Sequence, residues 1–197
     1  LAAAPIEGEA WRTALRRQDG TMIATLALMP MRLRAFAGLR LGRSLIVERG
    51  RIEVRLDAAM TKTGEPWSAP VPAPLEPILR RWLEEGRPAL LARGDGREDH
   101  LWLAMHGGRI KEGRITARIA EATTAALGVP IPPHFFRDAA ATTLARTSPE
   151  AARLTRALLG HSSHRTAERH YNHARSIEAG REYAAVLDRL MAEEDEG

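Results

Sequence analysis

The 197-residue chain contains no cysteine, and this absence excludes disulfide frameworks, thiolate metal sites and cysteine nucleophiles. No apolar run approaches the roughly 20 residues that a membrane span needs, and no charged-then-apolar signal peptide is present. Lysine is scarce, because the 29 basic residues divide into 27 arginines and only two lysines, Lys62 and Lys111. Each lysine in so arginine-rich a chain raises the question of what it does that arginine cannot.

The apolar and charged fractions, 44% and 27%, are ordinary and predict a soluble globular protein rather than a disordered one. The net charge is only +4, yet residues 176–197 carry seven acidic and two basic side chains. The remaining residues 1–175 hold 27 basic against 18 acidic side chains, a net charge of +9. Such a basic body attracts polyanions, and nucleic acid is the commonest of these.

Periodicity predicts an α+β domain, mainly α, with one small antiparallel sheet. Alternating polar and apolar residues at 51–56 predict a strand, and the turn at 63–66 joins two extended pieces of the stretch 60–72. Residues 101–105 form either a strand or a buried loop. The predicted helices cover about 22–28, 31–39, 75–83, 114–127, 135–145, 148–159, 165–173 and 177–191, with Gly86 and Gly128 as C-terminal caps.

The most informative residues form separate short motifs. HFFR occupies 134–137, LGH occupies 159–161 and YNH occupies 171–173. In order and spacing these resemble the H-x-x-R, L-G-H and Y-x-H motifs of the tyrosine recombinases, also called phage integrases. Upstream, TKTG at 61–64 resembles a segment of the hairpin that carries a lysine in this family. The resemblance covers 21–174, the catalytic domain.

The resemblance implies a helical catalytic domain that cuts DNA through a 3′-phosphotyrosyl intermediate. It implies Tyr171 as the nucleophile, Arg137 as a phosphate clamp and His134 as an aid to proton transfer at the tyrosine. It also implies that His161 hydrogen-bonds the phosphate and that Lys62 protonates the leaving 5′ oxygen. Lysine suits an acid's role because its pKa is tunable, whereas arginine stays protonated.

The first catalytic arginine of the family has two candidates in this chain. Arg40 lies in a G-L-R triplet like that of the family, but Arg32 directly follows the predicted apolar helix, as the family's arginine does. We therefore expect Arg32 to be the catalytic residue. The family often has a carboxylate three residues later, and here that position is Ala35, or Arg43 in the alternative register.

Double-stranded DNA is the partner that the resemblance implies, with a homo-oligomer, a tetramer, assembled on it. It implies no cofactor, metal, small-molecule substrate or membrane, and we expect a cytoplasmic protein. We divide the chain into a leader with a possible linker from a missing N-terminal core-binding domain (1–20), the catalytic domain (21–175), and a C-terminal helix with an acidic tail (176–197). Leucine in place of methionine at the start suggests a fragment or a processed product.

Other interpretations stay open at this point. A type IB topoisomerase uses the same covalent step but reseals the same strand. An inactive DNA-binding module is compatible with Ala35 and with the ten-residue spacing from His161 to Tyr171, where nine is commoner in the family. A zinc site in the histidine cluster 161–173 is a further alternative, although the motifs already account for two of its histidines. The terminal helix 177–191 either docks on a neighbouring protomer, as in the family, or packs in cis.

Overall fold

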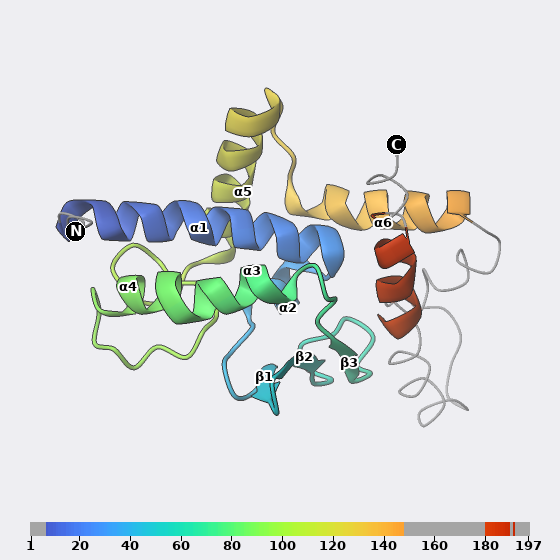
Figure 1. The fold of residues 1–197 in the computed structure, drawn as a ribbon, viewed down its shortest axis with the longest axis horizontal. Coiled ribbons are helices and arrows are strands. Elements are labelled where there is room, and N and C mark those ends of the chain that lie inside the picture. Colours follow the sequence, from blue (N-terminus) through green and yellow to red (C-terminus); the bar gives the residue numbers. More distant parts are fainter. Residues whose placement is uncertain (1–6, 148–179, 190, 192–197) are drawn as a thin grey trace.

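The computed structural model describes residues 7–147, 180–189 and 191, and Figure 1 shows how their elements are arranged. A long helix crosses the molecule, a second row of helices runs beside it, and a small sheet lies at one edge. The predicted α+β class, mainly α, is confirmed. In chain order the elements are α1 (Glu7–Leu28), α2 (Leu33–Ala37), β1 (Leu45–Glu48), β2 (Arg51–Leu56), β3 (Trp67–Pro70), α3 (Glu76–Arg81), the π-helical turn η1 (Trp82–Gly86), α4 (Arg87–Leu91), α5 (Glu112–Leu127) and α6 (Pro133–Thr147).

The first helix differs from the prediction, because α1 begins at Glu7 whereas the periodicity predicts a helix only after Thr21. Residues 7–20, expected to be leader and linker, form the first part of this helix. Among the residues there whose burial the structure describes, Ala14 and Gln18 are the most buried, at 3% and 0% exposed. Trp11 and Leu15 also pack against the core, so apolar residues do recur at helical spacing here, but the buried polar Gln18 interrupts that pattern before Met22.

The predicted helix 75–83 also continues beyond its expected end. α3, η1 and α4 follow one another without a break, so Gly86 is not a C-terminal cap as predicted. A Cβ atom at Gly86 would lie 2.6 Å from the ring of Trp82, which is fully buried. Glycine is therefore required at this position by close packing of an indole ring and not by a turn of the backbone.

The sheet is antiparallel, with the strand order β1-β2-β3. β2 coincides with the predicted strand, and Ile52, Val54 and Leu56 are buried on one face, as the alternation predicts. β1 has no counterpart in the prediction, because only its first residue is buried and its sequence shows no alternation. Arg49 and Gly50, with φ angles of 49° and 78°, form the two-residue turn between β1 and β2.

Three aromatic rings occupy the centre of the core. The rings of Phe36 and Trp102 lie 4.8 Å apart, and those of Trp82 and Trp102 lie 6.3 Å apart. The indole N–H of Trp102 donates to the carbonyl oxygen of Phe36 at 3.0 Å, which ties α2 to the segment 101–105. Of the two alternatives for that segment, the structure has the buried loop, with Leu103 in one isolated bridge.

The end of α5 agrees with the prediction. Gly128 has a φ angle of 77°, the left-handed conformation typical of a glycine after a helix, and its N–H donates to the carbonyl oxygen of Thr124 at 2.9 Å. A proline-rich connection then leads to α6, which carries the HFFR motif. The predicted helices 148–159 and 165–173 lie outside the described residues.

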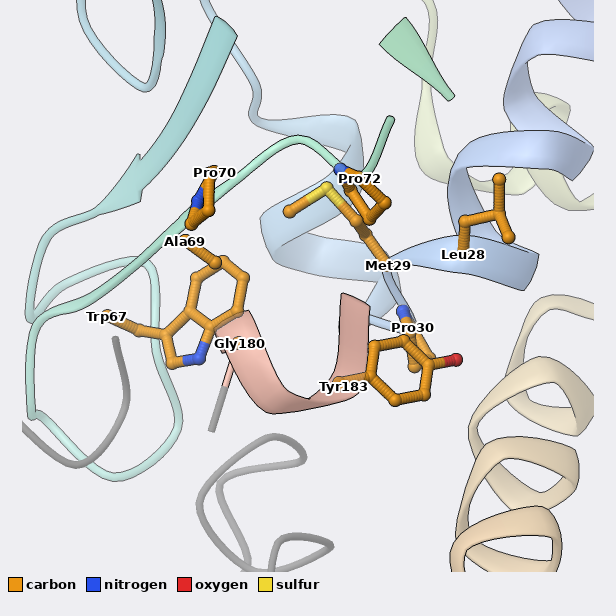
Figure 2. A pocket seen from close by; sticks show the side chains of 9 residues that line it. All are labelled: Leu28, Met29, Pro30, Trp67, Ala69, Pro70, Pro72, Gly180 and Tyr183. Carbon is orange, nitrogen blue, oxygen red and sulfur yellow. The ribbon is translucent and has the colours of Figure 1, made fainter. Parts of the chain in front are cut away.

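Residues 180–189 form a helix, as predicted, and Figure 2 shows part of it against the end of α1 and strand β3. The contact is close, because a Cβ atom at Gly180 would lie 2.7 Å from the Cβ of Ala69. The hydroxyl of Tyr183 donates to the carbonyl oxygen of Ala27 at 3.2 Å. This part of the terminal helix therefore packs in cis.

None of the helices in the described part of the chain combines the length and the apolar character that crossing a membrane requires.

Candidate active site

The connection between α1 and α2 positions Arg32. Met29 and Met31, each 5% exposed, anchor this connection in the core on either side of Pro30. Arg32 is the N-terminal flanking residue of α2, and its carbonyl oxygen accepts the N–H of Phe36 at 2.9 Å. The backbone of Arg32 is therefore held by the core, while its side chain is half-buried.

Arg137 approaches the same connection from the second turn of α6. Its Nη1 atom donates to the carbonyl oxygen of Pro30 at 3.3 Å. Burial and, second, the positive charge of Arg32 lower the pKa of Arg137 to about 10, while Asp138 acts in the opposite direction. Arg32 and Arg137, which are far apart in the sequence, thus lie close enough for their charges to interact.

His134 lies at the start of α6, three residues before Arg137. This spacing places the two side chains on the same face of the helix. The His134 ring is exposed and lies 4.8 Å from the ring of Phe135, also exposed. Pro133, the first residue of α6, is buried, and it anchors the beginning of this helix.

Lys62 lies in the loop 57–66 that joins β2 to β3, and its side chain is exposed. The turn forms where the sequence predicts it, and Gly64 there has a φ angle of 70°. The lysine is therefore presented at the tip of a hairpin, as the T-K-T-G resemblance implies.

Arg40, the alternative first arginine, is engaged elsewhere. Its Nε atom pairs with Oδ1 of Asp99 at 2.7 Å, and its backbone N–H donates to Oγ of Ser44 at 2.7 Å. The hydrogen bond from Arg40 lowers the pKa of Asp99, and the charge of Arg43 lowers it further. Arg40 thus joins the start of β1 to the loop that contains Asp99.

Glu98, Asp99 and His100 place their ligand atoms within 4.8 Å of one another, as residues around a metal ion do. His100 Nδ1, however, lies 2.6 Å from Oε1 of Glu98, and Asp99 pairs with Arg40. Because these groups hydrogen-bond to one another and to an arginine, we assign them to stabilising their loop.

The remaining predicted site residues, Tyr171 and His161, lie outside the described residues, and so does the histidine cluster 161–173. The contact that sequence reasoning missed is the Pro30 carbonyl oxygen, which accepts from Arg137. A backbone acceptor carries no motif, so no sequence signal could have indicated it.

The chain belongs to the phage integrase family, because the model of that family matches residues 9–177. Among its relatives are proteins named tyrosine recombinase XerC from Mycobacterium sp. strains KMS, JLS and MCS, each 34% identical over 110 residues. The match covers 55% of this chain and 36% of each relative, so the matched part spans about a third of their length. The family resemblance stated from the motifs is thus confirmed.

Proposed function

We propose that this chain is the catalytic domain of a tyrosine-type site-specific DNA recombinase, which cuts and rejoins strands through a 3′-phosphotyrosyl intermediate. The observation that carries the proposal is the approach of Arg32 to Arg137 from separate elements, with a lowered pKa for Arg137. Two guanidiniums whose charges interact suit an anion with two non-bridging oxygens, and a DNA phosphate is such an anion. The name of the relatives, tyrosine recombinase, supports the same activity.

In the first step the phenolic oxygen of Tyr171 attacks the phosphorus atom, and the bond from phosphorus to the 5′ oxygen breaks. Negative charge grows on the non-bridging oxygens in the transition state. Arg32 and Arg137 stabilise it, because fixed charges aimed at a developing anion need no reorganisation during the reaction. Energy is conserved in the new phosphate ester, so a 5′ hydroxyl from another strand reverses the step without hydrolysis.

Proton transfer completes the assignment. The tyrosine must lose its proton and the leaving 5′ oxygen must gain one. We assign the first transfer to assistance by His134, and the second to Lys62 as the acid. His161 is assigned as a hydrogen-bond donor to the phosphate. The placement of His134 on the same face as Arg137 supports its part in this assignment.

Duplex DNA as the partner agrees with the net charge of +9 on residues 1–175. Exchange between two duplexes cuts both strands of each, with one tyrosine for every strand. We therefore also propose a homo-tetramer on DNA. A cytoplasmic location is part of the same proposal, because the substrate is DNA.

Covalent trapping tests the proposal. The protein is incubated with a library of nicked duplexes with randomised sequence around the nick, so that cleavage releases a short strand and the adduct persists. We expect a protein–DNA band that resists denaturation, that is lost in Tyr171→Phe and that is retained in the matched control Tyr183→Phe. A band that survives in Tyr171→Phe, or no band over a range of salt concentrations, contradicts the proposal.

A topoisomerase-like activity gives the same covalent band, so a second readout separates it. A recombinase joins strands from two duplexes that carry the trapped sequence, whereas a topoisomerase relaxes a supercoiled plasmid without exchange. We expect exchange, and family membership favours it over both the topoisomerase and the inactive module.

A further inference from the structure

We propose that Thr61 is a positioning residue for Lys62, and that it holds the tip of the β2–β3 hairpin so that the ammonium group meets the leaving 5′ oxygen. This inference rests on the proposed function of Lys62 as the acid. Thr61 is the first residue of the T-K-T-G segment at 61–64, and the resemblance gives a role there only to the lysine. The hydrogen bonds around Thr61 indicate its role.

The Thr61 hydroxyl closes the loop that carries the lysine. Its Oγ1 atom lies 2.8 Å from the carbonyl oxygen of Glu65 and 3.2 Å from that of Ala58. A hydroxyl has one proton to donate, so the shorter contact, to Glu65, is the main bond. This bond joins Thr61 to Glu65 and leaves only the exposed residues 62–64 between them.

A second anchor lies one residue earlier. The backbone N–H of Met60 donates to two oxygens of Asp57, the side-chain Oδ1 at 3.0 Å and the backbone carbonyl oxygen at 3.1 Å. The Met60 side chain packs on the core, and its Cε would lie 3.3 Å from a Cβ atom at Gly38. Gly38 directly follows α2, whose N-terminal flanking residue is Arg32. The base of the loop is therefore tied to the element that carries the proposed phosphate-binding arginine.

Thr61 is half-buried whereas Lys62 is exposed, so the loop combines a fixed base with a solvent-facing lysine. Lysine has a long flexible side chain, and proton donation in the transition state needs hydrogen-bonding distance. A loop that moved freely would leave the ammonium at that distance for a small part of the time. Fixing the backbone on both sides of Lys62 therefore raises the rate of proton transfer without any contact between Thr61 and DNA.

The test replaces the bridging 5′ oxygen of the nicked duplex by sulfur and measures single-turnover cleavage. With oxygen, the bond from phosphorus to the leaving atom breaks as that atom takes a proton from Lys62. With sulfur, a stable thiolate leaves without a proton, so the acid is no longer needed. A variant that only weakens the acid's position is slow on the oxygen substrate and normal on the sulfur substrate.

Thr61→Val keeps the branched shape and removes the hydroxyl. We expect cleavage of the oxygen substrate to slow roughly 10- to 100-fold, as for a small misplacement of a catalytic group, and cleavage of the sulfur substrate to stay at the wild-type rate. Thr61→Ser, which retains a hydroxyl, should restore most of the activity. Thr63→Val, which changes the exposed threonine on the other side of Lys62, is the matched control and should cleave both substrates normally. A normal rate on sulfur also shows that each variant is folded and binds DNA.

Equal loss on both substrates, or no loss on oxygen, overturns the positioning role of Thr61. Lys62→Ala is run in parallel, so that the role of Lys62 as the acid is tested separately from the role of Thr61. If sulfur does not rescue Lys62→Ala, the acid assignment fails, and this inference fails with it. If sulfur rescues Lys62→Ala but Thr61→Val behaves as wild type, only the inference fails and the proposed function stands.

Discussion

Separate alanine substitutions at Arg32 and Arg40 decide which arginine belongs to the cleavage site. Arg40→Ala removes the ion pair between Arg40 and Asp99, in which the two side chains are 38% and 32% exposed, respectively. Ion pairs with this degree of exposure contribute about 0–1 kcal/mol. We therefore expect the free energy of unfolding to fall by no more than that amount, and the rate of DNA cleavage to stay unchanged.

Arg32→Ala instead removes the guanidinium whose charge acts on Arg137. Loss of one donor to a developing oxyanion slows a reaction by roughly 10²–10³-fold, or about 2.7–4 kcal/mol in the activation free energy. We expect the rate of covalent adduct formation to fall by that factor. The pKa of Arg137 should rise in the same variant, because the charge of Arg32 is one of the causes that lower it.

Single-turnover adduct formation on the trapped nicked duplex measures the catalytic effect, and urea unfolding measures stability. Asp99→Ala is the matched control, because it breaks the ion pair of Arg40 while both arginines remain. We expect it to behave like Arg40→Ala. The reasoning is refuted if Arg40→Ala slows adduct formation as much as Arg32→Ala does.

Two further predictions concern buried groups. Gln18 is fully buried, and its side-chain amide donates to the carbonyl oxygen of Leu103 at 2.9 Å and accepts the N–H of the same residue at 2.7 Å. Gln18→Met leaves both backbone groups of Leu103 unpaired, so the free energy of unfolding in urea should fall by about 2–6 kcal/mol. An unchanged midpoint of unfolding would contradict this prediction. Burial raises the pKa of Tyr183 to about 12, so ultraviolet titration of Tyr171→Phe, in which it is the only tyrosine, should show ionisation near that pH. Because the pKa is higher in the folded than in the unfolded protein, the contribution of this phenol to stability is complete below about pH 10 and is lost as the pH rises through about 12. Ionisation of Tyr183 near pH 10 in the folded protein would instead show that its phenol is exposed.

Local patterns predicted the elements whose buried positions are apolar. β2 shows a strict alternation, and the end of α5 carries Gly128 in the conformation that its position indicates. At the beginning of α1 the apolar residues Trp11, Ala14 and Leu15 are followed by Gln18 in place of an apolar residue. Gln18 is buried through its hydrogen bonds to Leu103, a contact that only the folded chain provides. Hydrophobic periodicity indicates which apolar side chains leave water on folding. It does not identify a buried polar side chain whose hydrogen bonds form only in the tertiary structure.

The candidate site also has a local part that the sequence predicts and a tertiary part that it does not predict. The spacing of His134 and Arg137 is local, so the sequence alone predicts that they share a helix face. The approach of Arg137 to Pro30 and Arg32 is tertiary, and it depends on where α6 passes the end of α1. Sequence reasoning favoured Arg32 over Arg40 only by its place after an apolar helix. The structure adds a physical reason to propose Arg32, because its charge acts on Arg137 whereas Arg40 pairs with Asp99.

The missing carboxylate after Arg32 also has a structural context. Ala35 is 3% exposed within α2, so an acidic side chain there would be buried at a high desolvation cost. One acceptor that the structure places at this site is the carbonyl oxygen of Pro30, which accepts a hydrogen bond from Arg137. A carbonyl oxygen orients a guanidinium without adding a negative charge, whereas a carboxylate would compete with the phosphate for the same arginine. Burial in α2 thus gives a structural reason for alanine at position 35, and the departure does not by itself favour an inactive module.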